Sequence, residues 1–356
     1  MLVSGWTEHP GGRHHGAHGG LISRSFGFET ADLLDYSQNI NPLGTPPAAL
    51  EAARRALYEE SGRYPDLDYA ELREALAGYL GTSPSKVVPT NGGAEALYLA
   101  ARAADPGKAL VLEPTFSEYA TAASAAGMGV VRRVTRRRED GFRFDPGSLE
   151  GLDGISVVFL CNPNNPTGDS LNRREVREIA GRVRDGGAVL VVDEAFADFV
   201  PEISVAAEVD EGLCVARSFT KFFAIPGLRL GCLVCDDAPR VQALQPSWSV
   251  NAVASAAGIS AVRDVGFAET SVAEVARLRK ELYTSLEMLP GIEPFPGAAN
   301  FLLVHGPEGL PERLARRGVL VRGCDPFVGL GPGYFRVAVR TEAENGRLIA
   351  ETREEL

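Results

Sequence analysis

The most constraining feature of this sequence is a series of short apolar runs that alternate with helix-like segments. Residues 155–161 and 188–192 are almost entirely apolar, and an Arg- and Glu-rich helical segment at 173–184 separates them. Apolar runs of this length are typical of strands buried on both faces of a sheet. Strands that alternate with helices predict a mostly parallel α/β sheet, which binds ligands at the carboxyl ends of its strands.

The same alternation extends through the first two thirds of the chain. Apolar periodicity and turn residues predict further strands at 87–89, 109–113, 129–134, 213–217 and 228–235, and helices at 48–58, 69–80, 91–104 and 116–126. Beyond about residue 247 the pattern changes to a long helical stretch at 252–289, interrupted near Gly266, and to strands near 319–322 and 334–339. We therefore expect an N-terminal arm and loop at 1–45, a large domain at 46–246 and a small α+β domain at 247–356.

The charge of the chain limits its partners. A formal net charge of -11 over 356 residues argues against nucleic acid or an anionic membrane as a partner. No apolar run approaches the roughly 20 residues of a membrane-spanning helix, and the polar N-terminus lacks the core of a signal peptide. We expect a cytoplasmic protein that binds neither nucleic acid nor membrane.

The cysteines and histidines form no clear metal or disulfide pattern. Five cysteines are an odd number and lack the spacing of a disulfide framework. Cys232 and Cys235 have CxxC spacing, but they lie in a predicted strand with no second ligand pair. Four histidines crowd the N-terminus, at positions 9, 14, 15 and 18, and we expect the first three to belong to a mobile arm, with metal binding as the alternative. We predict no metal site.

Lys221 is the residue around which the candidate chemistry is arranged. Only four lysines occur in the chain, and Lys221 alone lies between hydroxyl side chains and the apolar run at 222–225. Desolvation disfavours the ammonium form and leaves a neutral, nucleophilic amine, as a lysine that forms a Schiff base requires. The alternative is a lysine whose aliphatic stem covers apolar surface while its amine reaches water.

Further loops at predicted strand ends carry residues that suit an anionic aromatic cofactor. The loop at 91–95 opens a helix and offers backbone N–H groups to a phosphate, although Gly-rich turns also arise for steric reasons. Asn165 lies in a loop constrained by two Asn-Pro bonds. Asp193, at the end of a buried strand, either caps the next helix or pairs with a protonated pyridine nitrogen. The side chains near Lys221 that suit a phosphate are Ser218, Thr220 and Arg229. Together these residues predict a pyridoxal phosphate site.

Four motifs resemble those of the fold-type I pyridoxal-phosphate enzymes, the aspartate aminotransferase superfamily: NNPTG at 164–168, DEA at 193–195, SFTK at 218–221 and GLRLG at 227–231. The similarity runs from about residue 16 onward. It implies an α/β fold, with a large domain whose seven-stranded, mostly parallel sheet is flanked by helices, and a smaller α+β domain. It also implies pyridoxal 5'-phosphate as the cofactor.

Two branches of this superfamily compete, the histidinol-phosphate aminotransferases and the threonine-phosphate decarboxylases of cobalamin synthesis. Both resemble the chain at 63–66. The stretches that favour the decarboxylases lie at 18–20, 37–44, 193–196 and 248–251. Aminotransferases of this superfamily usually have a tyrosine where this chain has Phe196, and Phe196 cannot hydrogen-bond to the phenolic oxygen of the cofactor. A simple packing role for Phe196 is the alternative.

The resemblance assigns roles to individual residues. Lys221 would bond to the cofactor and later move protons, and Asp193 would pair with the pyridine nitrogen. Tyr119 would stack on the cofactor ring, with ordinary core packing as the alternative for Tyr119 and Tyr64. The residues expected at the cofactor phosphate are Gly93, Ala94, Ser218, Thr220, Arg229 and, from the other subunit of a homodimer, Tyr64.

The expected substrate is a phosphorylated amino acid, L-threonine O-3-phosphate. Arg322 and Arg336 lie in apolar, strand-like surroundings, where a buried guanidinium needs an anion. His18, Gly19 and Asn39 resemble substrate-gripping residues of the decarboxylases. Asn165 is expected to contact both cofactor and substrate.

We therefore expect a lyase that releases CO2 and 1-amino-2-propanol phosphate. The alternatives are a histidinol-phosphate aminotransferase and, disfavoured by the absence of a basic extra domain, a regulator derived from this fold.

Overall fold

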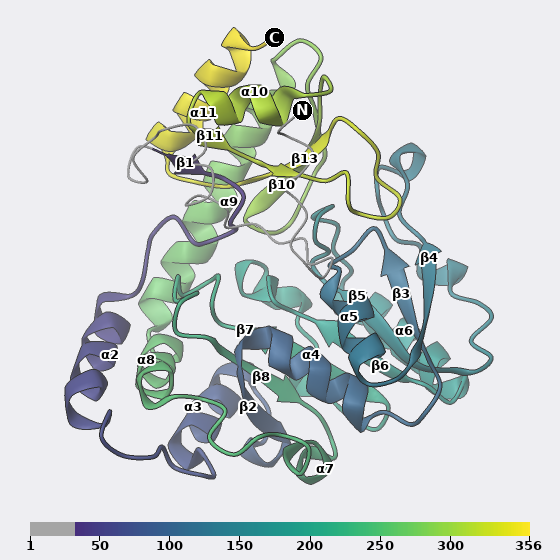
Figure 1. The fold of residues 1–356 in the computed structure, drawn as a ribbon, viewed down its shortest axis with the longest axis vertical. Helices are drawn as coiled ribbons and strands as arrows, with labels where there is room; N and C mark the ends of the chain where they lie inside the picture. Colours follow the sequence, from purple (N-terminus) through teal and green to yellow (C-terminus); the bar gives the residue numbers. More distant parts are fainter. Residues whose placement is uncertain (1–32) are drawn as a thin grey trace.

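The computed structural model describes residues 33–356, in two layers that lie one above the other in Figure 1. The lower layer is built on a seven-stranded sheet of order β2-β8-β7-β6-β5-β3-β4. Its strands are β2 (Val87–Asn91), β3 (Lys108–Glu113), β4 (Gly129–Val134), β5 (Ile155–Cys161), β6 (Val189–Asp193), β7 (Leu213–Ser218) and β8 (Leu230–Val234). Only β8 runs against its neighbours, which confirms the predicted mostly parallel sheet.

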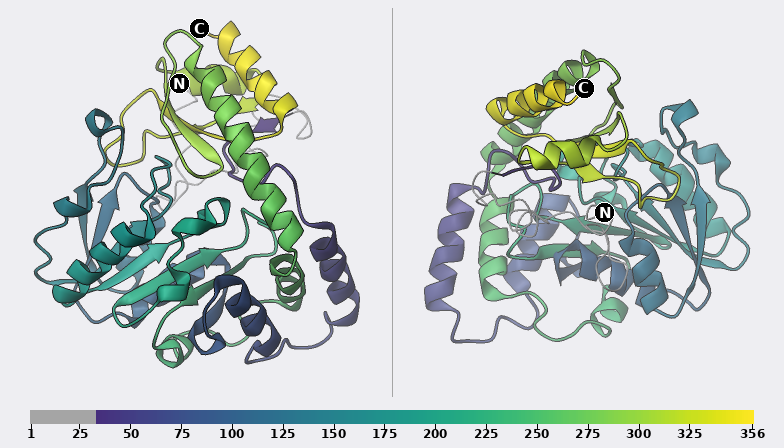
Figure 2. Two further views of the ribbon diagram at one scale, coloured as in Figure 1. Left: turned by 180° about the vertical axis from the view of Figure 1, so that it is seen from behind. Right: turned by 45° about the horizontal axis from the view of Figure 1, so that its top comes forward.

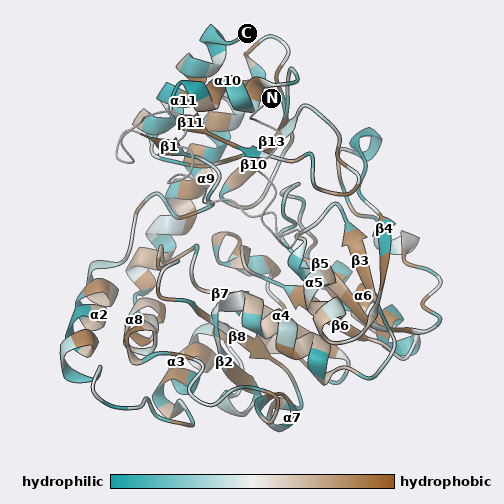
Figure 3. Ribbon diagram, in the orientation of Figure 1, coloured by the Kyte–Doolittle hydropathy of each residue, from teal (hydrophilic) through white to brown (hydrophobic). Residues whose placement is uncertain are grey.

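An apolar core lies on each face of this sheet. Along β5, Val158 and Leu160 pack in one core, whereas Val157 and Phe159 pack in the other, because successive side chains of a strand point to opposite faces. Strands β3 and β8 are accordingly hydrophobic in Figure 3. The helices over the first face are α3 (Ala70–Leu80) and α6 (Arg173–Asp185), and those over the second are α4 (Gly92–Ala103), α5 (Glu118–Ala125) and α7 (Ala238–Gln242).

The upper layer contains a four-stranded antiparallel sheet of order β12-β13-β10-β9 and a short parallel pair, β1-β11. The long helix α9 rises from the lower layer into the upper one (Figure 2). The remaining elements are β1 (Leu34–Asp35), α2 (Pro47–Glu59), α8 (Ala252–Val262), α9 (Val265–Glu287), β9 (Glu293–Pro294), β10 (Phe301–His305), α10 (Leu310–Arg316), β11 (Val319–Leu320), β12 (Arg322–Gly323), β13 (Tyr334–Ala338) and α11 (Glu342–Glu354).

The break in the predicted helix at 252–289 lies slightly earlier than Gly266. Helix α8 ends before Arg263, and Asp264 starts α9 by accepting a hydrogen bond from the backbone nitrogen of Phe267 at 3.0 Å. An aspartate that satisfies a free N–H of the first turn is a strong helix start. The capping side chain, rather than the glycine, therefore sets this boundary.

The strand predicted at 319–322 is two strands in different sheets. Residues of β11 pair with β1, whereas β12 pairs with β13. The prediction of one strand was wrong because the chain changes partners within this segment, and a local apolar pattern does not report which strand lies alongside.

Several absences hold for the part of the chain that the structure describes. Within residues 33–356, no helix combines the length and the apolar character needed to cross a bilayer. In the same range, no three His, Cys, Asp or Glu side chains are grouped so that they could hold a metal ion. All five cysteines are free thiols, and Cys232 and Cys235 are buried. The four N-terminal histidines lie outside the described residues.

Candidate active site

A cavity of about 330 Å³ lies where β5, β6 and β7 end, between the two layers. The parallel strands bring their carboxyl ends to one edge of the sheet, which is where a ligand was predicted. Residues 37–40, between β1 and α2, form part of its wall. The predicted site residues that line it are Asn39, Gly93, Ala94, Asn165, Asp193, Ser218, Thr220, Lys221, Arg229, Arg322 and Arg336.

Lys221 lies in the turn that follows β7. Its amine nitrogen lies 3.3 Å from Oγ of Ser218 and 5.3 Å from the centre of the Phe196 ring. Burial lowers the pKa of this amine, and the nearby carboxylate of Asp193 opposes the shift. A lowered pKa increases the fraction of neutral, nucleophilic amine, which is the property that a lysine needs to attack an aldehyde.

Two hydrogen bonds anchor Asp193 at the end of β6. The hydroxyl of Tyr119 donates to Oδ2 at 2.8 Å, and the backbone nitrogen of Ala195 donates to Oδ1 at 2.9 Å. Burial raises the pKa of Asp193, while Lys221 and Tyr119 act to lower it. The bond to Ala195 is a local turn contact, and the carboxylate also lines the cavity. Asp193 does not cap the next helical turn, which begins after Phe196, so its carboxylate remains a candidate partner for a ligand in the cavity.

Tyr119 occupies a different place from the one predicted. Its ring is fully buried, stacks on Phe159 with 5.3 Å between ring centres, and is not part of the cavity wall. Phe116, in the loop before α5, lines the cavity and meets Tyr119 edge to face at 5.8 Å. Phe116 is thus the aromatic side chain available to a cofactor ring, while Tyr119 supports Asp193 from behind the wall.

A cradle for an anion lies at the N-terminus of α4. Gly92 has a φ of 75°, and a Cβ there would lie 2.6 Å from Nη2 of Arg229. A Cβ on Gly93 would lie 2.9 Å from the Cβ of Ser218. Glycine at both positions lets the helix N-terminus approach these side chains closely. The hydroxyls of Ser218 and Thr220 lie 2.9 Å apart. Backbone N–H groups, two hydroxyls and a guanidinium therefore surround a space that suits a phosphate.

Arg336 reaches the cavity from β13 in the upper layer. It donates through Nη1 to Oδ1 of Asn165 and through Nη2 to the carbonyl of Ser37 at 2.8 Å, and it lies 5.3 Å from the centre of the Phe301 ring. Its Nε is buried without a partner among the described residues. Burial lowers the pKa of Arg336 to about 10, so an anion beside it would stabilise the guanidinium.

Arg322 and Asn39 complete the wall opposite Lys221. Arg322 lies 6.0 Å from the centre of the Phe327 ring, and burial lowers its pKa. Asn39 is buried, and its Oδ1 lacks a hydrogen-bond partner within residues 33–356. A buried acceptor of this kind is costly unless a ligand or an ordered water donates to it.

Besides Tyr119, one predicted site residue within 33–356 does not line this cavity, namely Tyr64. His18 and Gly19 lie outside the described residues. Tyr64, between α2 and α3, is 79% exposed and stacks on Trp248 with 4.5 Å between ring centres. It is not part of the cavity wall of its own chain.

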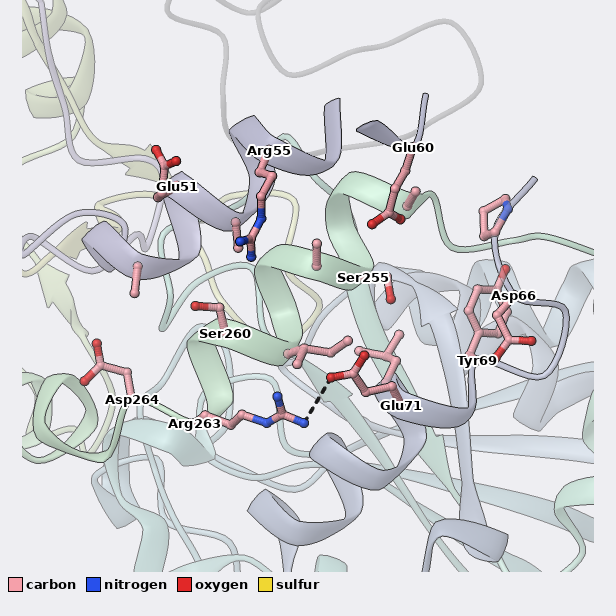
Figure 4. Close-up of a pocket in the computed structure, with 17 residues that line it drawn as sticks. Glu51, Arg55, Glu60, Asp66, Tyr69, Glu71, Ser255, Ser260, Arg263 and Asp264 are labelled. Carbon is pink, nitrogen blue, oxygen red and sulfur yellow. Dashed lines mark ion pairs between the residues drawn. The ribbon is translucent and has the colours of Figure 1, made fainter. Parts of the chain in front are cut away.

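A second, larger hollow of about 870 Å³ lies between α2, α3 and α8 (Figure 4). Figure 4 shows Glu51 and Arg55 on α2, and Arg263 paired with Glu71 at 3.3 Å. Among residues 33–356, no predicted site residue lines this hollow. Size alone therefore does not identify the active site, whereas the grouping of Lys221 with anion-binding side chains does.

Sequence reasoning missed several residues of the cavity wall. Phe116 had a recognisable signal, because it lies in a loop directly after a buried strand. Cys161 ends β5, but a lone cysteine in an apolar run has no distinguishing pattern. Phe327 lies in a loop of the upper layer, and only the packing of the two layers brings it to the site.

Comparisons with known proteins agree with this geometry. Residues 31–351 match the family described as "Aminotransferase class I and II". The chain is 38% identical to the threonine-phosphate decarboxylase of Salmonella typhimurium over 353 residues, which cover 95% of this chain and 96% of the relative. It is 34% identical to the histidinol-phosphate aminotransferase of Methanopyrus kandleri, over 92% of this chain and 89% of the relative.

A solved structure has the same fold. The histidinol-phosphate aminotransferase from Clostridium acetobutylicum superposes with a TM-score of 0.85 at 28% identity, over 91% of this chain and 99% of that chain. The relatives thus share the fold while differing in the reaction that their names state.

Proposed function

The chain belongs to the aminotransferase class I and II family and takes pyridoxal 5'-phosphate as its cofactor, and on this premise we propose that it is a threonine-phosphate decarboxylase. The proposed reaction converts L-threonine O-3-phosphate into CO2 and (R)-1-amino-2-propanol O-2-phosphate, a step of cobalamin synthesis. When bound, the cofactor supplies an electron sink for the electron pair that remains when a bond to the amino-bearing carbon breaks.

The residues around the cavity fit this cofactor. Lys221 would supply the amine that bonds to its aldehyde carbon, and Asp193 would supply the carboxylate that pairs with its ring nitrogen. Phe116 lines the cavity and would pack against the ring. Asn165 accepts from Arg336 through Oδ1, which leaves its amide nitrogen as the donor to the phenolic oxygen. The phosphate is held by Gly93, Ala94, Ser218, Thr220 and Arg229.

The two buried arginines fit a substrate with two anionic groups. Arg336 and Arg322 lie on neighbouring strands of the upper sheet, where Cα of one pairs in register with Cα of the other. A guanidinium binds a carboxylate or a phosphate through paired hydrogen bonds. Asn39 adds an unpaired acceptor for a substrate donor. His18 and Gly19, which precede the described residues, complete the proposed substrate-binding set.

Phe196 is the single observation that favours decarboxylation. The side chain is buried, lines the cavity, and lies with its ring 5.3 Å from the amine of Lys221. It also packs edge to face on Phe301 at 4.9 Å between ring centres. Phe196 thus faces the reacting groups and offers them no hydrogen bond, where a transaminating relative would place a phenolic hydroxyl.

Lys221 is also the proposed acid for the last step. Loss of CO2 breaks the bond between the carboxylate carbon and the amino-bearing carbon, and the electron pair stays with the latter. A proton must then return to that same carbon. Lys221 lines the cavity, and its protonated amine is the group that we assign to deliver this proton.

The test separates the two reactions by product. Holoenzyme is incubated with threonine phosphate carrying a labelled carboxyl group, and released CO2 is counted. In a second arm, the enzyme receives histidinol phosphate and 2-oxoglutarate, and glutamate formation is measured. Labelled CO2 with an unchanged cofactor spectrum is the expected outcome. Glutamate formation with no CO2 would overturn the proposal.

A histidinol-phosphate aminotransferase is the second candidate, and one observation favours it. The solved structure with a TM-score of 0.85 carries that name, and the same lysine, aspartate and arginines would serve its reaction. In that reaction the amino-bearing carbon loses a proton instead of CO2, and the cofactor ends in its amine form. Lasting conversion of the cofactor spectrum by an amino donor is its signature.

The proposed enzyme is a homodimer that shares its active sites. Large apolar side chains are exposed on and around α2, which Figure 2 shows at the edge of the molecule. These side chains are Leu50, Leu57, Tyr58, Tyr64, Leu67 and Trp248. Exposed apolar groups gathered on one surface are typical of an interface. A second copy on this surface would bring Tyr64 of the partner subunit to the cofactor phosphate.

A further inference from the structure

The loop between β1 and α2 crosses the turn that carries Lys221. The backbone nitrogen of Asn41 donates to the carbonyl of Lys221 at 3.0 Å, and its side-chain amide donates to the carbonyl of Phe222 at 2.8 Å. The hydroxyl of Thr45 donates to the carbonyl of Ala224 at 2.8 Å. The loop therefore holds the backbone of this turn at three carbonyl groups, that of Lys221 itself and two that follow it.

Asn41 is the centre of these contacts. Its side chain is 3% exposed, and both its donor and its acceptor atoms are used. The amide also donates to Oγ of Ser271 at 2.9 Å, and Oδ1 accepts from the backbone nitrogen of Leu43 at 3.0 Å. Ser271 is a fully buried residue of α9. Asn41 thus joins its own loop, the Lys221 turn and the helix that leads into the upper layer.

The same loop reaches the substrate side of the cavity at its other end. The carbonyl of Ser37 accepts from Arg336 at 2.8 Å, and Asn39 lines the cavity. A segment of a few residues therefore contacts both the proposed anion-binding arginine and the turn of the reactive lysine. Asn41 itself does not line the cavity.

We propose that Asn41 is a positioning residue for Lys221, which holds the amine at its place among the charged groups of the cavity through the backbone of the turn. The proposal rests on the proposed function in one respect, the choice of Lys221 as the lysine that bonds to the cofactor. Asn41 touches neither the cofactor site nor the substrate site, and its effect passes through Lys221.

The position of the amine matters because several charged or titratable groups face it. The carboxylate of Asp193 and the thiol of Cys161 favour its cationic form, whereas Arg229, Arg336 and burial itself favour the neutral form. Burial is the largest of these effects and lowers the pKa of Lys221. A loosened turn would let water reach the amine, and its pKa would rise towards that of an exposed lysine.

The test uses the reactivity of the amine in the cofactor-free protein. Acetic anhydride is added over a range of pH, and acetylation of Lys221 is measured by mass spectrometry of its peptide. Only the neutral amine reacts, so the midpoint of the rate against pH reports its pKa. We expect Asn41→Ala and the isosteric Asn41→Asp to raise this midpoint by about one pH unit, which is a tenfold loss of neutral amine at lower pH.

Asn345→Ala is the matched control. Asn345 is also a buried asparagine, and it bonds to the backbone of Arg340 through both ends of its amide; neither residue lines the cavity. Its substitution is expected to lower the melting temperature while leaving the Lys221 midpoint unchanged. If an Asn41 variant and Asn345→Ala lose similar stability but only the Asn41 variant shifts the midpoint, loss of stability does not explain the shift.

Two results would overturn the proposal. One is an unchanged midpoint in Asn41→Asp together with a stability loss like that of the control. The other is failure of both Asn41 variants to fold while Asn345→Ala folds, which would assign Asn41 to the fold alone. Borohydride reduction of the wild-type holoenzyme, followed by peptide mapping, tests the premise separately. Cofactor found on another lysine would contradict the proposed function without changing the acetylation result.

Discussion

The hydroxyl of Tyr119 lies 2.8 Å from Oδ2 of Asp193, at the end of the central strand β6. Tyr119 is fully buried and is not part of the cavity wall. Tyr119 can therefore act on a bound ligand only indirectly, through the carboxylate that its hydroxyl contacts and through Phe116, which its ring contacts. Burial raises the pKa of Asp193, and the hydrogen bond from Tyr119 opposes this rise because it favours the charged form.

Tyr119→Phe should weaken cofactor binding most at low pH. The hydroxyl lowers the pKa of Asp193, so its removal raises that pKa, and the carboxylate becomes protonated at a higher pH as the pH falls. A hydrogen bond to a charged group contributes about 1.5–3 kcal/mol, so at least about tenfold weaker binding is expected. The measurement is the cofactor dissociation constant against pH. The control is Tyr98→Phe, which removes a hydroxyl that bonds to Glu118. It should not change the dependence of the cofactor dissociation constant on pH.

Gly92→Ala should displace Arg229 and weaken phosphate binding. The new Cβ would lie 2.6 Å from Nη2, and the residue has a φ of 75°. Gly187→Ala introduces the same backbone strain at a φ of 75° but meets no atom within 4 Å. Both variants should lose about 1–2 kcal/mol of stability. Only Gly92→Ala should raise the dissociation constant of the cofactor. An equal rise in both variants would contradict the proposal that the cofactor phosphate binds beside Gly92 and Arg229.

Arg336→Gln should lower kcat/KM for threonine phosphate by at least about 100-fold, because two charge-assisted hydrogen bonds to an anion are lost. Arg322→Gln should have an effect of the same kind. Arg143→Gln, an exposed arginine outside the cavity wall, is the control. Substrate analogues that lack either the carboxylate or the phosphate would show which anion each arginine holds. An Arg336 variant with unchanged KM and kcat would exclude it from substrate binding.

Phe196→Tyr should shift the balance of reactions. The added hydroxyl would lie beside Lys221 and offer a hydrogen bond to the phenolic oxygen of the cofactor. We expect slower CO2 release and a larger fraction of cofactor converted to its amine form in each turnover. Phe199→Tyr, at a buried phenylalanine that packs on Phe222, controls for the cost of burying a hydroxyl. An unchanged ratio of the two products in Phe196→Tyr would reduce this residue to a packing role.

The proposed dimer with shared active sites predicts complementation between two inactive variants. Lys221→Ala and Tyr64→Ala should each be nearly inactive as pure dimers. In a mixed dimer, one of the two sites would combine an intact Lys221 with Tyr64 of the partner subunit. Random mixing of equal amounts should therefore restore about a quarter of the wild-type sites, since half of the dimers are mixed. Activity no greater than the sum of the two separate variants would place Tyr64 outside the partner's site.

Most of the large sheet could be predicted because its signals are local. The strands at 155–161 and 129–134 have the observed bounds, since each is a run of strand-forming residues between turns. The helix at 69–80 ends at Gly81, which has a φ of 67°, as its residue type indicated. Chain order and strand ends then predicted where most of the candidate site would gather.

The failures have a common cause. Tyr119 and Phe116 are both aromatic residues near the start of α5, and the position of Phe116 directly after a buried strand makes it a candidate without excluding Tyr119. The choice depends on the exact start of the helix and on packing against Phe159. The division of residues 319–322 between two sheets likewise depends on β1 and β13.

The sequence by itself determined the α/β class, the family and the grouping of Lys221, Asp193 and the phosphate-binding residues, because these follow from local motifs at strand ends. The tertiary structure alone decided which side chains face the cavity from the upper layer, and it placed Asn41 across the Lys221 turn. Such contacts join residues as far apart as Asn41 and Ser271. They arise only when burial of apolar surface brings distant segments together, and no local pattern records them.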